Sequence, residues 1–267
     1  MPVQTVRSRL GGVPPVASEP ATRASVLGCE IDRLDMAGMV ARIDEVIAVR
    51  GFAQHAAINA AKIVAMREDD ELERIVRGCE LVSADGQSIV WASRVLSDPL
   101  PTRVAGIDLM QELLGLAERR GYRVFILGAK EDVLARAISR IRERHPRLVV
   151  AGARDGYFSD DDAAAVADEV ASYRPDIVFV AMPSPRKEYW LGHHGRRLGA
   201  PFVMGVGGSV DVLAGHVRRA PVLMQRLGLE WLFRLAQEPR RLFRRYLITN
   251  TRFLMCVAGE FVRRRVR

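Results

Sequence analysis

The sequence has few cysteines and no long apolar run. Only three cysteines occur among 267 residues, and they are widely separated: Cys29, Cys79 and Cys256. An odd, scattered set of this kind is neither a disulfide framework nor a zinc-ligand pattern. We therefore expect a reducing compartment, the cytoplasm. No stretch of about 18 apolar residues predicts a membrane-spanning helix, and the N-terminus lacks the charged start and apolar run of a signal peptide.

Metal-ligand patterns are also missing. The acidic run Asp160–Asp162 follows Ser159 at the start of a predicted helix. Carboxylates there are favoured by the positive end of the helix dipole, so we interpret the run as a helix start. The pair His193 and His194 lies within a predicted helix and has no carboxylate at metal spacing. We expect neither a bound metal nor another cofactor.

Aromatic residues are scarce, at 6 %, whereas apolar residues reach 49 %. A core built mainly from Ala, Val, Leu and Ile is expected.

Positive charge is plentiful but unevenly distributed along the chain. Residues 218–267 hold thirteen Arg and three Glu, a net charge of +10, whereas the other 217 residues hold 27 basic and 29 acidic side chains, a net charge of −2. A cationic segment on a nearly neutral body suggests an anionic partner such as phospholipid, a diphosphate or nucleic acid.

Short apolar strands alternate with helices from residue 54 onward. The predicted strands are Gln54–Ile58, Leu81–Ser83, Tyr122–Leu127, Leu148–Ala151, Asp176–Ala181 and Pro201–Val206. The predicted helices are Asn59–Gly78 with a break near Asp69 and Asp70, Gly86–Leu96, Ile107–Arg120, Asp132–Arg144, Asp160–Tyr173 and Ser184–Leu198. This alternation predicts an α/β fold with a Rossmann-like, mostly parallel sheet flanked by helices. Ligands of such sheets bind beyond the carboxyl ends of the strands.

An acidic residue follows the second predicted strand, in Ser83-Ala84-Asp85-Gly86. At that place Asp85 is a candidate general base, able to take the proton from an attacking hydroxyl. The alternative is that Asp85 only caps the helix that starts near Gln87. Taken alone, the motif favours the cap.

Glycines follow two other predicted strands. Gly128, in Leu127-Gly128-Ala129-Lys130, would let a phosphate approach the N-terminus of the next helix. The motif lacks a complete G-x-G-x-x-G pattern, so a tight turn explains it at least as well. Gly205, Gly207 and Gly208 stand before Asp211 at the end of the last predicted strand. They favour close approach of a nucleotide or sugar about as strongly as a turn required by packing.

The segment Pro183–Trp190 follows the most apolar strand. Two prolines fix a loop there, and Arg186, Lys187 and Glu188 then open a helix. These charged groups are candidates for contact with a donor sugar or its phosphates, although a solvated first turn is the simpler interpretation from the residues alone.

The C-terminal segment is rich in arginine and carries apolar residues between the arginines. Arg binds phosphate oxygens through its planar fork. The interleaved apolar residues are Leu223, Leu227, Trp231, Phe233, Leu235, Leu242 and Phe243. This combination is typical of helices at a bilayer interface, and a solvated basic helix would not explain the aromatic residues.

In their order and spacing these motifs resemble the WecG/TagA/CpsF family, glycosyltransferase family 26, from about Ile58 to Arg245. The resemblance is carried by Ala84-Asp85-Gly86, Arg103–Asp108, Pro185–Trp190, Gly205–Gly208 with Asp211, Arg219–Pro221, Glu230-Trp231 with Arg234, and Glu238-Pro239. It implies an inverting enzyme that transfers a hexose or N-acetylhexosamine, N-acetylmannosamine being usual, from a UDP-sugar to a polyprenyl-diphosphate-linked acceptor.

The resemblance also implies roles for individual residues. Asp85 corresponds to the proposed base of the family, and Asn59 to the Asn of a Thr-x-Asn pattern in which Ala57 replaces the Thr. Lys187 replaces the Gln of Pro-x-Gln-Glu. The implied substrate-binding residues are Asn59, Arg103, Gly128, Pro185, Lys187, Glu188, Gly205, Gly207, Gly208, Asp211, Arg219 and Arg234. Arg219 or Arg234, with backbone N–H groups near the glycines, would stabilise the leaving UDP.

The expected organisation is a disordered leader at residues 1–24, a catalytic domain at 25–215 and a basic helical appendage at 216–267. The leader is rich in Pro, Gly, Ser and Arg. The appendage would bind the inner face of the plasma membrane peripherally and cover the active site. Three alternatives stay open. The first is an NAD-dependent oxidoreductase, for which the complete glycine fingerprint is missing. The second is a nucleic-acid-binding protein, although the basic segment contains no recognised binding motif, and the third is a non-catalytic partner of a polysaccharide synthase.

Overall fold

The computed structural model describes residues 22–226 and 228–266. Its elements up to the third strand of the sheet are β1 (Arg23–Val26), β2 (Cys29–Asp32), α1 (Met36–Ala48), β3 (Ala53–Ile58), α2 (Ala60–Met66), α3 (Asp70–Arg77), β4 (Leu81–Ala84), α4 (Gln87–Val95), α5 (Gly106–Arg120) and β5 (Arg123–Gly128). The remaining elements are α6 (Glu131–Arg144), β6 (Val149–Arg154), α7 (Ala163–Ser172), β7 (Ile177–Ala181), α8 (Arg186–His194), the 3₁₀ helix η1 (Gly195–Leu198), β8 (Phe202–Gly205), α9 (Ser209–Leu213), α10 (Val222–Arg226), α11 (Glu230–Gln237) and α12 (Pro239–Val266).

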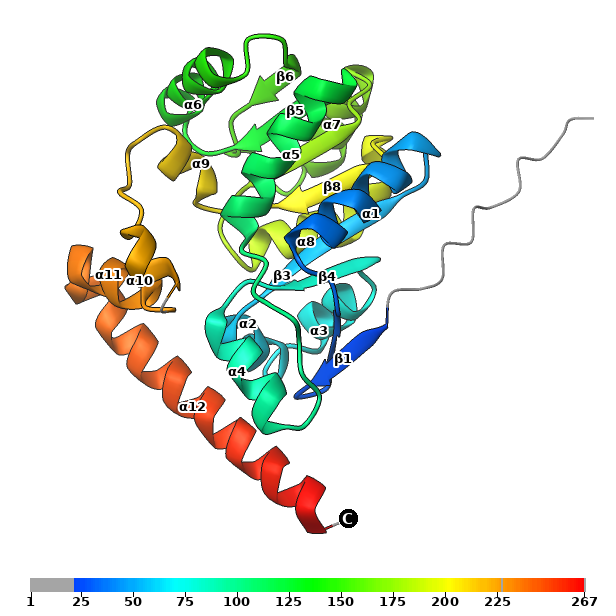
Figure 1. Ribbon diagram of the computed structural model, residues 1–267. Coiled ribbons are helices and arrows are strands. Elements are labelled where there is room, and N and C mark those ends of the chain that lie inside the picture. The colour runs from blue at the N-terminus through cyan, green and yellow to red at the C-terminus, as the bar shows by residue number, and fades with distance from the viewer. Residues whose placement is uncertain (1–21, 227, 267) are drawn as a thin grey trace, which may run out of the picture.

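Six parallel strands form the central sheet in the order β4-β3-β8-β7-β5-β6. The predicted α/β fold with a parallel sheet is therefore confirmed. All five residues of β7 are buried, as expected for a strand covered by helices on both faces. Apolar side chains of α1, α5, α6 and α9 pack in one cluster with the sheet, and those of α7 and α8 pack in a second. Figure 1 shows the helices around the sheet.

Local signals explain where several helices begin and end. Asn59 caps α2 and Asp69 caps α3, and each side chain accepts a hydrogen bond from a backbone N–H three residues later. The predicted break near Asp69 is thus confirmed. Helix α5 ends at Gly121, which adopts the left-handed conformation with φ of 74°. Helix α7 begins at Ala163 and not at Asp160, because residues 160–162 form a turn in which the Ser159 hydroxyl bonds to Asp162.

An antiparallel hairpin and a helix precede the sheet, where the sequence analysis predicted no element. Strands β1 and β2 pair from Arg23↔Asp32 to Val26↔Cys29, so the predicted leader boundary at residue 24 is too late. The other residues of that predicted leader, up to residue 21, lie outside the described part of the chain. The Asp32 carboxylate connects the hairpin to the sheet, since it accepts hydrogen bonds from the side chain of Arg23 and from the Val82 N–H.

The C-terminal helices leave the sheet after α9 (Figure 1). Helix α12 is 28 residues long and contacts α2. Its Phe253 is 4 % exposed and lies in a third apolar cluster with residues of α2, α3, α4 and the hairpin. Helix α12 is therefore part of the protein core as well as a basic surface helix. Within the described residues, no helix combines the length and the apolar character needed to cross a bilayer.

Candidate active site

Four residues predicted to act in catalysis or substrate binding lie at the carboxyl edge of the sheet. Asp85 follows β4, Asn59 follows β3, Gly205 ends β8, and Lys187 follows β7 by six residues. These four strands are consecutive in the sheet. The sheet order thus brings together residues from distant parts of the sequence. Gly128 ends β5, one strand further along the same edge.

Asp85 is held by the start of helix α5. Its Oδ1 accepts a hydrogen bond of 2.8 Å from the Gly106 N–H, and Gly106 is the first residue of α5, whose N-cap makes no side-chain hydrogen bond. The N-terminus of α5 thereby fixes the orientation of the carboxylate. The alternative that Asp85 caps α4 is wrong: Gly86 is the N-cap there and has no side-chain bond. The carboxylate is partly exposed, and Oδ2 accepts no hydrogen bond from any described residue.

The loop after β3 lies against the loop after β4. A Cβ added to Gly86 would meet the Cβ of Asn59 at 3.3 Å, and one added to Gly106 would lie 3.8 Å from the Cβ of Ala57 and 3.9 Å from Oδ1 of Asp85. Asn59 uses its Oδ1 to cap α2 by accepting from the Lys62 N–H. Its amide N–H groups remain the available donors of this side chain.

A buried ionic cluster lies beside this loop. The Lys62 and Lys187 ammonium groups are 2.7 Å and 2.6 Å from the same oxygen of Glu188, and all three side chains are at most 11 % exposed. Although burial alone would raise it, the two lysines hold the pKa of Glu188 below its usual value. Burial and repulsion from Lys62 lower the pKa of Lys187. The cluster has a net charge of +1, and neither oxygen of Glu188 has a partner of regular hydrogen-bond geometry among the described residues, so its contacts with the two lysines are ion pairs.

Gly205 makes room for one arm of this cluster. A Cβ at Gly205 would lie 3.0 Å from both Cδ and Cε of Lys187, which is tighter than most Cβ contacts in proteins. The lysine stem therefore crosses the end of β8 directly over this glycine. The charge of Asp85 acts on Lys187 and raises its pKa, although less than burial lowers it. The ammonium group and the Asp85 carboxylate thus belong to one electrostatic environment.

The glycines of the other loops differ in what they provide. Gly207 has φ of 51° and, together with the exposed Gly208, leaves backbone open near Asp211. Gly128 has φ of 114°, and an added Cβ would lie 2.6 Å from the backbone of Ala181. The tight approach of two strands explains Gly128 without a ligand, as the turn interpretation of that motif expects.

The loop after β7 is held in place by contacts of Arg186 with a neighbouring loop. The Ser184–Pro185 peptide bond is cis, and α8 starts at Arg186. The Arg186 guanidinium donates to the carbonyl oxygens of Gly156 and Phe158 and stacks over the Phe158 ring at 4.9 Å. Arg186 therefore positions the loop, whereas Lys187 and Glu188 point into the buried cluster.

Two predicted arginines meet two carboxylates from distant segments. Arg219 donates to both oxygens of Asp108 at 2.5 Å and 2.8 Å, and Arg103 donates to Glu230 at 3.1 Å. Arg219 is also 3.5 Å from Glu230, and Arg103 is 3.9 Å from Asp108. This four-residue cluster joins the start of α5 to the start of α11. In this structure both arginines are therefore engaged with carboxylates of the protein itself.

The appendage covers the helix that follows Asp85. Gly228 packs so closely on α4 that an added Cβ would lie 2.7 Å from side-chain atoms of Gln87. Arg234 lies one turn after Glu230 on α11, is exposed, and forms no side-chain hydrogen bond or ion pair with the described residues. It is thus an available cation near the Arg103–Glu230 pair. Leu227 of the interleaved apolar set lies outside the described residues.

The sequence analysis missed two polar groups beneath the site. Lys62 is the only charged residue of α2, and that isolated charge was the available signal. His55 is buried in β3, and its Nε2 lies 3.0 Å from the Ser83 hydroxyl, which also donates to the Val104 carbonyl. Burial and the charge of Lys62 lower the pKa of His55 to about 3, so the ring is neutral. Its Nδ1 has no partner among the described residues.

Comparison with known proteins gives an independent result. The profile of the Glycosyl transferase WecG/TagA/CpsF family matches residues 24–267. The chain is similar to the N-acetylglucosaminyldiphosphoundecaprenol N-acetyl-beta-D-mannosaminyltransferase of Bacillus subtilis (strain 168), with 36 % identity over 184 residues, which cover 69 % of this chain and 71 % of that protein. The protein of the same name from Bacillus spizizenii (strain ATCC 23059 / NRRL B-14472 / W23) is 36 % identical over 174 residues, 65 % of this chain and 67 % of its own length.

Proposed function

The chain belongs to the WecG/TagA/CpsF family of glycosyl transferases, and we propose that it moves a sugar from a UDP-linked donor to a polyprenyl-diphosphate-linked acceptor with inversion at the anomeric carbon. The family membership decides against the oxidoreductase and nucleic-acid-binding alternatives. In this proposal residues 25–215 form the catalytic domain and residues 216–267 the appendage. The product would serve cell-surface polysaccharide or exopolysaccharide synthesis.

One observation carries the proposed mechanism: the start of α5 fixes one oxygen of Asp85, and no residue that the structure describes bonds to the other. The acceptor hydroxyl attacks the anomeric carbon from the face opposite the diphosphate. Its proton passes to Oδ2 of Asp85 as the new C–O bond forms. The bond between the anomeric carbon and the diphosphate oxygen breaks, and UDP leaves with the electron pair. A single displacement of this kind inverts the configuration.

The leaving diphosphate gains negative charge as this bond breaks, so the site must supply cations or N–H donors. Arg234 is an exposed guanidinium of the appendage near this edge, and Gly208 offers a backbone N–H, whereas the Gly207 N–H already donates to the Val180 carbonyl. Arg103 and Arg219 support this arrangement by holding α11 against α5. In this assignment Arg219 acts on the diphosphate indirectly, unless substrate binding opens its pair with Asp108.

The proposed donor sugar follows from the similarity of this chain to its two relatives. Both relatives are named as N-acetylmannosaminyltransferases that act on N-acetylglucosaminyldiphosphoundecaprenol, so an N-acetylhexosamine donor and that class of acceptor are the first to test. Asn59 would contact the donor through its amide N–H groups. Lys187 places an ammonium group where the family pattern has a Gln, and Ala57 lacks the hydroxyl of the family Thr. Both differences concern recognition of the sugar, so a simple hexose donor stays among the candidates.

The proposed location is the inner face of the plasma membrane, bound peripherally. The net charge of residues 218–267 is +10, and each basic residue near an anionic leaflet contributes about 1 kcal/mol of attraction. Several apolar side chains of the appendage are largely exposed, among them Leu223, Phe243 and Leu247. Charge together with exposed apolar surface is the combination that holds a helix at a bilayer interface.

A screen of UDP-sugars tests the proposal. The full chain is mixed with each UDP-sugar and a short-chain prenyl-diphosphate N-acetylglucosamine, and the release of UDP is measured with and without the acceptor. We expect acceptor-dependent release with one donor class, lost in Asp85→Asn and kept in Asp132→Asn, which alters an exposed carboxylate on α6. The absence of acceptor-dependent release with every donor would reject the transfer reaction and favour the non-catalytic alternative.

A further inference from the structure

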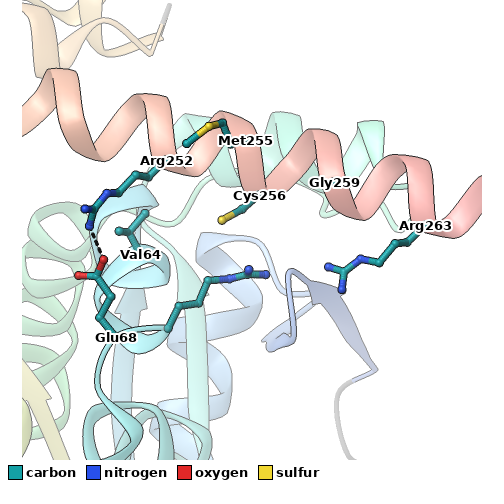
Figure 2. Close-up of a pocket in the computed structure, with 8 residues that line it drawn as sticks. Val64, Glu68, Arg252, Met255, Cys256, Gly259 and Arg263 are labelled. Carbon is teal, nitrogen blue, oxygen red and sulfur yellow. Dashed lines mark hydrogen bonds and ion pairs between the residues drawn. The ribbon is translucent and has the colours of Figure 1, made fainter.

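A groove of about 330 Å³ lies between α12 and the end of α2, away from the proposed active site. Three arginines line it: Arg67 from the end of α2, and Arg252 and Arg263 from α12. Its apolar lining includes Val64 and Cys256. Figure 2 shows Cys256 and Arg263 on the side of α12 that faces α2, with Arg252 reaching Glu68.

The carboxylates nearby neutralise the charge of these arginines only in part. Glu68 pairs with Arg252, and Glu260 is shared by Arg263 and Arg264. Arg67 is exposed and has no ion pair with any described carboxylate. The groove therefore keeps a net positive charge supplied by guanidinium groups, which bind phosphate oxygens in a planar, bidentate manner.

An apolar stripe runs along α12 beside the groove. Ile248, Met255 and Val262 recur every seven residues, so they lie along one side of the helix. They are 42 %, 62 % and 58 % exposed, and Met255 also lines the groove. A free anion would leave this stripe in water, whereas a lipid would satisfy both parts at once, with its phosphate in the groove and its acyl chains along the stripe.

We propose that the α2–α12 groove is a binding site for the phosphodiester headgroup of an anionic phospholipid, and that the adjoining stripe enters the acyl region of the leaflet. The inference rests on the proposed membrane location of the appendage and assigns it a specific contact. Helix α2 starts next to Asn59 at the active site and ends at the groove. Its seven residues span about 10 Å, so a headgroup held there would keep the active-site edge close to the bilayer that carries the acceptor.

Vesicle binding by the full chain tests the site. The variant Arg67→Gln/Arg263→Gln removes two groove charges, and the matched control Arg240→Gln/Arg244→Gln removes two exposed charges from the beginning of α12. Sedimentation with phosphatidylcholine vesicles that contain the anionic lipid phosphatidylglycerol gives the affinities. We expect the groove variant to lose at least about tenfold more affinity than the control. Equal losses would overturn the site, because they indicate diffuse attraction by any basic residue.

A soluble lipid distinguishes a headgroup site from a site for free phosphate. Dihexanoyl phosphatidylglycerol below its micelle concentration should raise the thermal unfolding midpoint of the wild type saturably, and should not raise that of the groove variant. Inorganic phosphate at the same concentrations should have a much smaller effect. Equal stabilisation by phosphate would overturn the lipid assignment. Transfer to a short-chain acceptor should persist in both double variants. The transferase proposal fails if the wild type shows no transfer. The groove proposal fails on the lipid measurements alone, so the two failures can be told apart.

Discussion

The Oδ1 atom of Asp85 accepts a hydrogen bond of 2.8 Å from the backbone N–H of Gly106, at the start of α5. The two residues are 21 positions apart, and the segment between them consists of α4 and a loop whose Arg103 pairs with the appendage. The carboxylate proposed as the base is thus oriented by a helix terminus, and the same short segment binds the C-terminal helices. Orientation of the base and closure of the appendage are therefore expected to depend on each other.

Asp85→Asn should remove the base and keep the fold. An Asn Oδ1 still accepts from Gly106, so the loss of stability should stay near the helix-dipole contribution, about 0.5–1 kcal/mol. Transfer should fall by about 10²–10⁴-fold, the usual contribution of general-base catalysis. UDP release and thermal unfolding measure the two effects. Transfer within threefold of the wild type would remove Asp85 from this role.

Glu188→Gln should be strongly destabilising, because it leaves Lys62 and Lys187 buried without a counter-charge. Breaking a buried ion pair on one side typically costs about 3–5 kcal/mol. Glu71→Gln is the matched control, since Glu71 pairs with His193 at the surface and such pairs contribute about 0–1 kcal/mol. Urea unfolding compares the variants. Equal losses of unfolding free energy in the two variants would mean that the buried cluster has no special energetic role.

Gly205→Ala tests whether the path of the Lys187 stem matters for transfer. The new Cβ would lie 3.0 Å from two stem carbons, so the stem must shift by a few tenths of an ångström, and we expect this shift to displace the ammonium group. We expect transfer to fall about tenfold, an order of magnitude for displaced positioning groups. In a Lys187→Ala background the same change should have little further effect, because the clashing atoms are absent. If the losses of transfer activity in this double-mutant cycle are additive, Gly205 does not act through Lys187.

The sequence predicted the sheet well because its strands are continuous apolar runs, of which Ile177–Ala181 is the clearest. It predicted the break at Asp69 and the end of α5 at Gly121 because single residues determine those points. It did not reveal the β1–β2 hairpin, since strands of four residues next to a Pro- and Gly-rich segment carry too little periodicity.

The sequence pattern could not predict contacts between segments that are distant along the chain. Glu188 lies 126 positions from Lys62, and nothing in either local segment predicts their ion pair. The family resemblance predicted that Arg103 and Arg219 bind substrate. Their engagement with Asp108 and Glu230 depends on how the appendage folds back. Similarly, basic composition alone did not indicate that α12 buries Phe253 in the core.

Arg219→Lys should loosen the appendage. Lysine has no planar fork and cannot reproduce the two bonds to Asp108. Arg197→Lys is the control, because Arg197 also forms two bonds to one carboxylate, Asp168, but at the exposed surface. Hydrogen exchange across residues 218–237 should accelerate in the first variant only, together with a loss of transfer of about tenfold or more. Unchanged exchange in Arg219→Lys would show that the four-residue cluster does not hold α11.

The buried His55 should make the free energy of unfolding depend on pH at values above those at which carboxyl groups titrate. Burial lowers the pKa of His55 from 6.5 to about 3, so below pH 6.5 the unfolded chain takes up a proton that the folded chain does not. The free energy of unfolding should therefore decrease as the pH falls from 6.5 to 5, with a slope of up to about 1.4 kcal/mol per pH unit from this one group. Glu188 has its pKa held below 4.5, so its contribution is lost only at lower pH.

Urea unfolding between pH 5 and 7 measures this slope in the wild type, in His55→Gln and in His193→Gln, whose ring lies at the surface. The change at His55 should flatten the slope, because the buried ring takes up no proton in the folded chain over this range, and the change at His193 is the surface control. If His55→Gln does not fold, the ring can be followed directly by NMR in the wild type. A His55 signal that titrates near pH 6.5 in the folded protein would contradict the neutral, buried ring bonded to Ser83.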